Sequence, residues 1–329
     1  MLDKKFRKIV TVSCTALTLV FGAANINDSV AENVTYLLPA PAFLPAFGPW
    51  MLAQAKGYYK AEGLNVKFQR ARGGVDVAKQ VGAGNAVIGG GIGDTPVIVR
   101  GNGIPVKAVA LLGGGSLVQL VAHADRGING PADLKGKTIT ALSLQDTTYY
   151  TLLGMLASAG LTRHDVNAQG AGPAGVWKLF IAGKADAMAG VPDWIGIAQG
   201  AGKKIKIFPA TNYFKSMAQA ILASDKVIKE RPQLIKKLVR ATLKGMQDIM
   251  TNPDAAAKVY VKHVAKQKGK LGYIKNVFKM YNKYVYAGQK RIGEMDGARL
   301  AALQKFYFKH GIVRKELPVK QLYTNQFVK

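Results

Sequence analysis

Cysteine is almost absent from this sequence. Cys14 is the only one among 329 residues, and it lies in an N-terminal apolar run that we expect to be removed. The mature chain would then contain no cysteine. That excludes disulfide bonds, thiolate metal sites and cysteine nucleophiles, so the protein must be stabilised by its hydrophobic core.

Long apolar runs are also scarce. The clearest is Ile9–Ala24, about 16 residues long and short of the ~20 needed to span a bilayer. A basic head, Lys4–Lys8, precedes it, and the small residues Ser29–Ala31 follow. This pattern predicts a signal peptide over residues 1–31, cleaved after about Ala31, and hence a periplasmic protein. A membrane anchor is the alternative interpretation.

Acidic residues are few, with 19 Asp and Glu against 46 Lys and Arg, a net charge of +27. Residues 32–200 carry 14 basic and 10 acidic residues, a net of +4, whereas residues 201–329 carry 28 and 7, a net of +21. The excess is mostly Lys spread over expected helix faces. A solvated surface explains it without a nucleic-acid partner, although a basic surface-interaction protein stays an alternative.

Catalytic motifs are missing. The four histidines are scattered without a His-x-x-x-His spacing, and there is no G-x-S-x-G elbow or Walker loop. Gly89–Gly93 lacks the spacing and the later acidic residue of a dinucleotide-binding turn. We therefore predict a binding protein that is not an enzyme and has no catalytic residue, metal or cofactor.

Strand-like and helix-like segments alternate along residues 52–105. Leu64–Phe68 ends in the turn Arg72–Gly74, and Ala86–Ile92 ends in Gly93–Pro96. A helix-like segment follows each turn. Such βα units predict an α/β protein with parallel sheets and with ligands bound at the carboxyl ends of the strands.

A second α/β unit opens at the strand-like run Thr138–Leu142. The polar turn Ser143–Thr148 precedes a helix over Tyr149–Ala159, so this turn is either a helix cap or a binding site for polar groups. Two apolar runs, Leu117–Ala122 and Ala218–Ala223, are suited to carry the chain between two domains.

Several short motifs follow one another along the mature chain. Residues 55–66 read A-x-G-Y-Y-x-x-E-G-L-x-V, and Asp133–Ile139, Ile181–Ala187 and Asn252–Ala256 follow. In this respect the chain resembles the periplasmic substrate-binding proteins of ABC importers. The branch is the nitrate/sulfonate/taurine and thiamine-precursor binding family.

The resemblance implies a two-lobe periplasmic-binding-protein fold of type II with two hinge crossings. Lobe 1 would span residues 32–122 with 224–329 returning to it, and lobe 2 would span residues 123–223. A small organic ligand, anionic or aromatic, would bind between the lobes of a monomer, and an ABC permease in the inner membrane would be the partner.

Carried over by position, the resemblance also implies a set of ligand-binding residues. Asp94 and Thr95 would be polar contacts, Thr147 and Thr148 helix-end donors, and Arg72 the partner of a carboxylate or sulfonate. The full set is Phe43, Leu44, Arg72, Gly74, Asp94, Thr95, Ser116, Thr147, Thr148, Asp193 and Trp194. Phe43 and Trp194 would cover an apolar or aromatic face.

Two departures bear on the function that the resemblance implies. The family usually has an acidic residue just before the proline at position 192, whereas here Val191 precedes it and Asp193 follows.

Pyrimidine-precursor synthases share the fold and act as enzymes, but they rely on a cysteine-rich motif and a histidine. An enzyme of that kind is the alternative that the missing cysteines disfavour.

Overall fold

The computed structural model describes residues 31–328, so residues 1–30 of the expected signal peptide, which include Cys14, lie outside the described residues. Ten strands form two five-stranded sheets. The first has the order β2-β1-β3-β10-β4 and consists of β1 (Glu32–Leu38), β2 (Leu64–Arg70), β3 (Ile88–Ile92), β4 (Val106–Leu112) and β10 (Gln219–Ser224). The second has the order β7-β6-β8-β5-β9 and consists of β5 (Gln119–His123), β6 (Thr138–Ala141), β7 (Asn167–Gly170), β8 (Ala187–Gly190) and β9 (Ile205–Pro209).

Each sheet is mixed, whereas the sequence predicted parallel sheets. β10 runs antiparallel to β3 and β4, and β5 runs antiparallel to β8 and β9. The reason is the route of the chain, which leaves the first sheet at the carboxyl end of β4 and returns from the same side. Gln219, the first residue of β10, accordingly pairs with Ile92 and Leu112, the last residues of β3 and β4.

The chain passes between the sheets at residues 113–118 and 210–218. Both crossings lie a few residues before the lobe boundaries expected at residues 122 and 223. The apolar runs expected to cross, Leu117–Ala122 and Ala218–Ala223, instead contribute most of β5 and β10, which are fully buried interior strands of their sheets. Below, lobe 1 and lobe 2 denote the parts of the chain built on the first and the second sheet.

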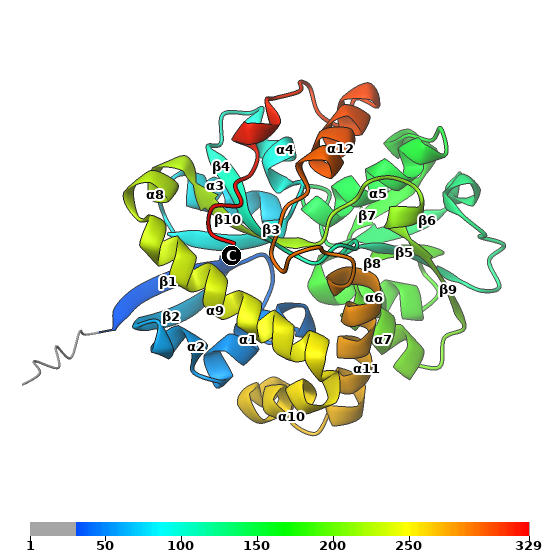
Figure 1. Ribbon diagram of the computed structural model, residues 1–329. Coiled ribbons are helices and arrows are strands. Elements are labelled where there is room, and N and C mark those ends of the chain that lie inside the picture. The colour runs from blue at the N-terminus through cyan, green and yellow to red at the C-terminus, as the bar shows by residue number, and fades with distance from the viewer. Residues whose placement is uncertain (1–30, 329) are drawn as a thin grey trace, which may run out of the picture. The chain divides into compact units, whose positions relative to one another are not determined.

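Helices pack against both sheets (Figure 1). They are α1 (Gly48–Ala55), α2 (Tyr58–Ala61), α3 (Gly74–Gly82), α4 (Thr95–Arg100), α5 (Thr147–Ser158), α6 (Gly172–Ile181), α7 (Pro192–Gly200), α8 (Asp225–Glu230), α9 (Pro232–Thr251), α10 (Pro253–His263), α11 (Leu271–Tyr281) and α12 (Gly297–Lys309). Short 3-10 or π turns lie at η1 (Pro45–Phe47), η2 (Pro131–Leu134), η3 (Arg163–Asp165), η4 (Ala210–Asn212), η5 (Ala265–Gln267), η6 (Asn282–Tyr286) and η7 (Val319–Gln321). None of the helices within residues 31–328 is long and apolar enough to cross a membrane.

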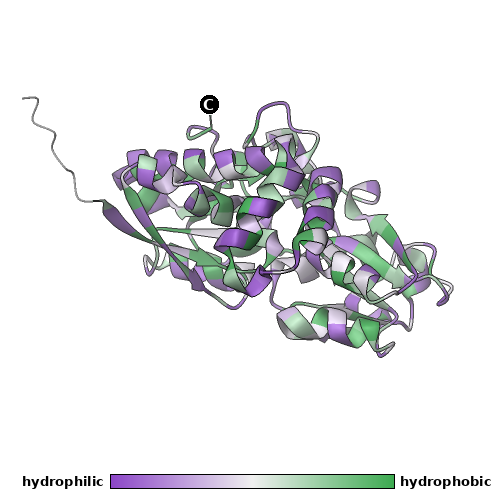
Figure 2. Cartoon of the chain, turned by 90° about the horizontal axis from the view of Figure 1, so that it is seen from below, coloured by the Kyte–Doolittle hydropathy of each residue, from purple (hydrophilic) through white to green (hydrophobic). Residues whose placement is uncertain are grey.

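The C-terminal helices cover the outside of this framework. Hydrophilic and hydrophobic residues alternate along the outer helices, as expected where one face of a helix meets the core (Figure 2). α9 lies across α1, where Gly245 is required because a Cβ atom there would be 2.0 Å from the carbonyl oxygen of Pro49. α11 packs on α7 of lobe 2, so the C-terminal part of the chain contacts both lobes.

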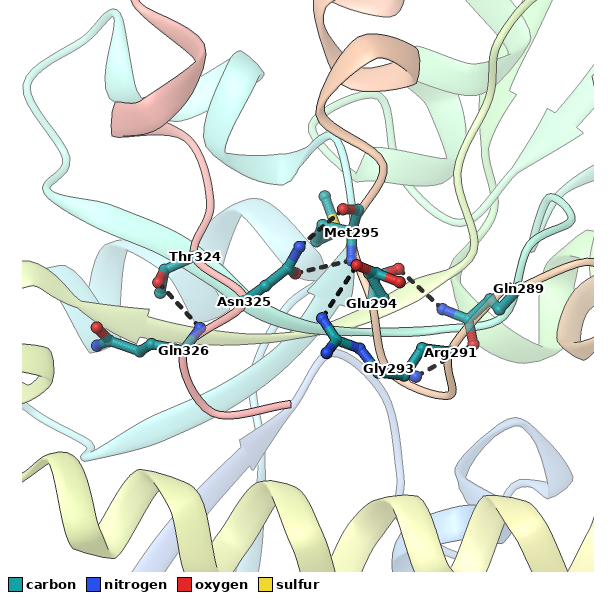
Figure 3. A network of polar contacts seen from close by, with 8 residues as sticks. All are labelled: Gln289, Arg291, Gly293, Glu294, Met295, Thr324, Asn325 and Gln326. Atoms are coloured by element: carbon teal, nitrogen blue, oxygen red, sulfur yellow. Dashed lines mark hydrogen bonds and ion pairs between the residues drawn. The ribbon is translucent and has the colours of Figure 1, made fainter. Parts of the chain in front are cut away.

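The last forty residues protect the outer edge of β4. Leu111 forms a bridge with Gly293, and Ala108 forms one with Tyr323. Figure 3 shows how this segment is held: the side chain of Asn325 accepts from the Met295 amide at 2.9 Å and donates to its carbonyl at 3.0 Å. The edge strand is thereby covered and cannot pair with another chain.

The first crossing is clamped by the C-terminal segment. The amides of Gly114, Gly115 and Ser116 donate to the carbonyls of Ala287, Val285 and Tyr284, at 3.0, 2.9 and 3.2 Å. Side chains have no room here, because Cβ atoms on residues 113–115 would lie 1.9–2.4 Å from backbone atoms of this segment. The glycine run that follows β4 is therefore explained by a close backbone approach.

Arg299, in the first turn of α12, joins the two crossings. Its guanidinium donates to the carbonyl oxygens of Gly114 and Gly115 in the first crossing and of Ser216 in the second. Burial lowers the pKa of this guanidinium. It remains charged and donates to three carbonyls at once, so one side chain links the two crossings.

We expect Arg299→Ala to lower the free energy of unfolding by about 3 kcal/mol, because three carbonyls lose a charged donor. Urea unfolding measures this loss. Arg291→Ala is the matched control, since Arg291 is exposed and pairs with Glu294 only three residues away; it should cost less than about 1 kcal/mol. Equal losses in the two variants would contradict the role of Arg299.

Candidate functional site

A cavity lies between the carboxyl ends of the two sheets. The space between its walls is about 550 Å³, part of which is open to solvent. Its walls come from both lobes and from the first crossing. The lining residues are Pro39, Ala40, Leu44, Ala46, Phe47, Trp50, Gly90, Gly91, Ile92, Leu117, Leu142, Asp146, Thr147, Thr148, Val191, Asp193, Trp194 and Gln219.

Aromatic side chains from both lobes line the cavity. Phe47 and Trp50, at the start of α1, meet edge to face with their ring centres 5.8 Å apart, and Tyr36 of β1 supports Trp50 from behind. Trp194, in the first turn of α7, contributes an indole from lobe 2. Flat apolar surfaces supplied from both lobes suit a flat apolar or aromatic ligand.

Four buried polar atoms in the lining have no hydrogen-bond partner among the described residues. They are the Oε1 atom of Gln219, the Oγ1 atom of Thr148 and the Nε1 atoms of Trp50 and Trp194. The amide of Gln219 has a fixed orientation, since its Nε2 atom donates to the carbonyl of Ala46 at 2.8 Å. An unpaired buried polar group costs about 1–3 kcal/mol, so a ligand that pairs with these atoms would recover that free energy.

Asp193 is the most strongly perturbed acid of the lining. Its side chain is fully buried, and burial raises the pKa to about 7, although its own backbone amide and the hydroxyl of Tyr281 oppose this shift. Tyr281 donates to Oδ1 at 3.3 Å, and the hydroxyl of Tyr273 donates to the main-chain carbonyl of Asp193 at 3.0 Å. α11 therefore fixes both the position and the environment of this carboxyl group.

Cations are missing from the cavity. None of the described residues that line it is Lys, Arg or His, whereas two carboxyl groups, Asp146 and Asp193, are present. Nor does any group of three His, Cys, Asp or Glu side chains within residues 31–328 have the arrangement of a metal site. The N-termini of α5 and α7 supply the positive electrostatic potential at this place.

Five of the residues predicted from the sequence line the cavity: Leu44, Thr147, Thr148, Asp193 and Trp194. Gly74 lies beside it and contacts Asp146. The turn before α5 both caps that helix, because Oδ1 of Asp146 accepts from the amide of Thr148 at 2.9 Å, and faces the cavity. The two interpretations of this turn are thus compatible.

The remaining predicted residues have other contacts. Arg72 is exposed and lies outside the lining. The ring of Phe43 lies beneath Lys266, with the Nζ atom 4.5 Å from the ring centre. Oγ1 of Thr95 accepts from the amide of Ile92 at 3.0 Å, and the hydroxyl of Ser116 donates to the carbonyl of Val118 at 3.0 Å.

Asp94 also has its partner elsewhere. It is buried behind the cavity, where the hydroxyl of Tyr307 donates to Oδ2 at 2.7 Å. Burial raises the pKa of Asp94 to about 6, against the opposing effect of this hydrogen bond. The carboxyl group thus anchors α12 to the end of β3.

Gln219, Trp50 and Phe47 line the cavity but are not among the residues predicted from the sequence. Gln219 had a signal, as a lone polar side chain in the otherwise apolar run from Met217 to Ala223. Trp50 and Phe47 gave no such signal, because an aromatic residue beside a proline-rich loop is as often part of the core.

The architecture and the interlobe cavity define a two-lobe protein with the fold of periplasmic binding proteins. The chain belongs to the NMT1/THI5-like family, whose model matches residues 44–256. It is 27% identical to the riboflavin-binding protein RibY of Chloroflexus aurantiacus, over 97% of this chain and 95% of that protein.

Two further proteins are similar to this chain, one in sequence and one in structure. A 4-amino-5-hydroxymethyl-2-methylpyrimidine phosphate synthase of Saccharomyces cerevisiae is 25% identical over 74% of each chain. The alkanesulfonate-binding protein SsuA of Xanthomonas axonopodis, bound to MOPS, has a similar structure with a TM-score of 0.69 and 15% identity, over 90% of this chain and 98% of that one.

We expect Asp193→Asn to increase stability above neutral pH but not at pH 4. The raised pKa means that the folded state keeps a proton that the unfolded state loses near pH 4, so the free energy of unfolding falls from about pH 4 to about pH 7. Asparagine does not titrate, and the variant should therefore gain about 2–4 kcal/mol relative to wild type between pH 4 and pH 8.

Urea unfolding at pH 4, 6 and 8 measures this difference. Asp125→Asn is the control, because Asp125 is exposed and lies outside the cavity lining; it should show no comparable gain. A stability difference that is the same at all three pH values would show that the carboxyl group of Asp193 does not titrate in this range.

Proposed function

We propose that this protein is the extracytoplasmic solute-binding component of an ABC importer and that it captures a flat, uncharged nitrogen heterocycle. The observation that carries the proposal is the lining of the cavity. Aromatic residues of both lobes line the space, four lining residues have unpaired hydrogen-bonding atoms, and no basic side chain lies among its described residues.

Ring recognition follows from these groups. A heterocycle placed between Trp194 and Trp50 would bury its faces against indole rings. Its edge would carry acceptors for the Trp194 N–H and the Thr148 hydroxyl and a donor for Gln219 Oε1. The protonated carboxyl group of Asp193 could donate a further hydrogen bond. Riboflavin, the compound after which the relative RibY is named, has a ring system of this kind.

A sulfonate or carboxylate ligand fits the same cavity less well. The cation expected for it, Arg72, is exposed outside the lining. A buried anion without a cationic partner pays a large desolvation cost, and the carboxylate of Asp146 would add repulsion. We therefore choose the aromatic part of the expectation from the sequence over the anionic part.

Capture would occur by closure of the two lobes about residues 113–118 and 210–218. The lining supports this proposal, because residues of both lobes contribute to one cavity and a ligand there would contact both lobes at once. We further propose export by the N-terminal segment, a periplasmic location, a monomeric state and an inner-membrane ABC permease as the partner.

A pyrimidine-precursor synthase is the second candidate function. The yeast relative supports it. Among the described residues, however, the cavity lining contains neither Cys nor His, and the buried His123 hydrogen-bonds through Nε2 to the carbonyl of Phe180 within lobe 2. These residues favour binding over catalysis.

A panel of ligands tests the proposal. Riboflavin, a hydroxymethylpyrimidine, MOPS and benzoate would each be added to residues 32–329, and unfolding would be followed by heat. A ligand at 100 times its Kd adds about 2.7 kcal/mol, a shift of a few degrees. We expect a shift with an uncharged heterocycle; a shift with MOPS or benzoate alone would overturn the choice of ligand class.

Substitution of one indole tests the geometry of the site. Trp194→Phe keeps an aromatic ring but removes the N–H donor, and we expect a roughly tenfold higher Kd for the responding heterocycle, or about 1.4 kcal/mol. Trp177→Phe is the control, since Trp177 lies on α6 outside the cavity. Titration calorimetry measures both, and equal affinities in the two variants would place the ligand elsewhere.

A further inference from the structure

One buried carboxylate joins the two lobes directly. Asp146 lies in lobe 2, in the turn between β6 and α5, and only 1% of its surface is exposed. Its Oδ1 atom accepts from the amide of Thr148 in its own lobe at 2.9 Å, and its Oδ2 atom accepts from the amide of Gly74 in lobe 1 at 2.7 Å. The carboxylate therefore caps α5 and, across the cleft, the first residue of α3.

The surface that receives this carboxylate is made of glycine. A Cβ atom on Gly73 would lie 2.5 Å from Oδ2 of Asp146, and one on Gly74 would lie 2.7 Å from Oγ1 of Thr147. Gly74 is not among the glycines with positive φ, so its own backbone conformation does not demand glycine. Glycine is needed at position 74 because the two lobes approach so closely there.

We propose that Asp146 is a specificity-determining latch: it docks onto the N-terminus of α3 when the cleft closes and thereby excludes anionic ligands. α3 has nine residues, and its N-terminus carries a partial positive charge that favours an anion. Asp146 supplies that anion from within the protein. The amide that a ligand anion would need at this edge of the cavity is already bonded.

The same carboxylate also repels a bound anion. Asp146 is itself a lining residue, and no basic side chain occurs among the described lining residues. An anionic ligand would have to displace Asp146 from α3 or lie beside it without a counter-charge. An uncharged ring has neither cost, so the latch disfavours anionic ligands while it holds the lobes together.

This inference deepens the proposed function, on which it rests for the opening and closing of the lobes. Its test therefore includes a measurement that needs no ligand. The mature chain has no cysteine, so the pair Lys79→Cys and Lys178→Cys, exposed on α3 and α6, would carry the only two spin labels. Double electron–electron resonance then measures the distribution of separations between the lobes.

The latch would be altered in two independent ways. Gly74→Ala leaves the carboxylate intact but introduces the Cβ atom that meets Thr147. Asp146→Asn keeps a good N-cap residue for α5 but removes the charge. Asp133→Asn is the matched control, because the carboxylate of Asp133 accepts from the amide of Asn129 within lobe 2 without reaching the other lobe.

We expect both latch variants to populate the short, closed separation less than wild type and the control, with or without ligand. Asp146→Asn should also change the ratio of the Kd values for riboflavin and MOPS by at least tenfold in favour of MOPS. Equal distance distributions in all four proteins, or an unchanged Kd ratio, would overturn the latch. If riboflavin binds to none of them, the proposed ligand class fails, while the distances still decide about the latch.

Discussion

The chain passes twice between its two sheets, and a single guanidinium hydrogen-bonds to both of these crossings. Arg299 donates to carbonyls of both crossings, and the cavity begins only a few residues away from them. Leu117 lines the cavity two residues after Gly115, whose carbonyl Arg299 binds in the first crossing. Gln219 lines it three residues after Ser216, whose carbonyl Arg299 binds in the second. Gln119 reinforces this link, since its Nε2 atom donates to the carbonyl of Ser116 at 2.8 Å. The position of the binding groups thus depends on how the hinge is fixed.

The second constraint is the separation of charge from the site. The formal charge of +27 resides mostly after residue 200, on helices whose Lys side chains lie outside the core. The cavity instead contains carboxyl groups whose negative charge is balanced by helix ends, backbone amides and, for Asp193, by protonation. Net charge therefore describes the surface of this protein, and the chemistry of the ligand must be argued from the lining.

Much of the fold could be predicted from local sequence patterns. The βα units, the two-lobe class and the turn at Ser143–Thr148 follow from alternating apolar segments, Gly-rich turns and family motifs. The direction of β5 and β10 did not follow, because an apolar strand has the same pattern in parallel and antiparallel pairing. Only the route of the chain decides it.

The site was predictable where a residue's place along the chain determines its surroundings. Thr147, Thr148 and Trp194 lie in first turns of helices at strand ends, and all three line the cavity. Arg72 occupies an equivalent turn, but a long side chain can turn to solvent, and it does so here. Gln219 and the contact of Asp146 with Gly74 depend on segments far apart in the chain, which one sequence without relatives does not reveal.

The position of β10 has a consequence for the order in which the chain can fold. β10 lies between β3 and β4, and it supplies the hydrogen bonds that join them. A chain made only as far as lobe 2 therefore has two unpaired strand edges where its first sheet should be continuous. The N-terminal sheet is completed only after Ser224 has been added, so the lobe that begins first is finished last.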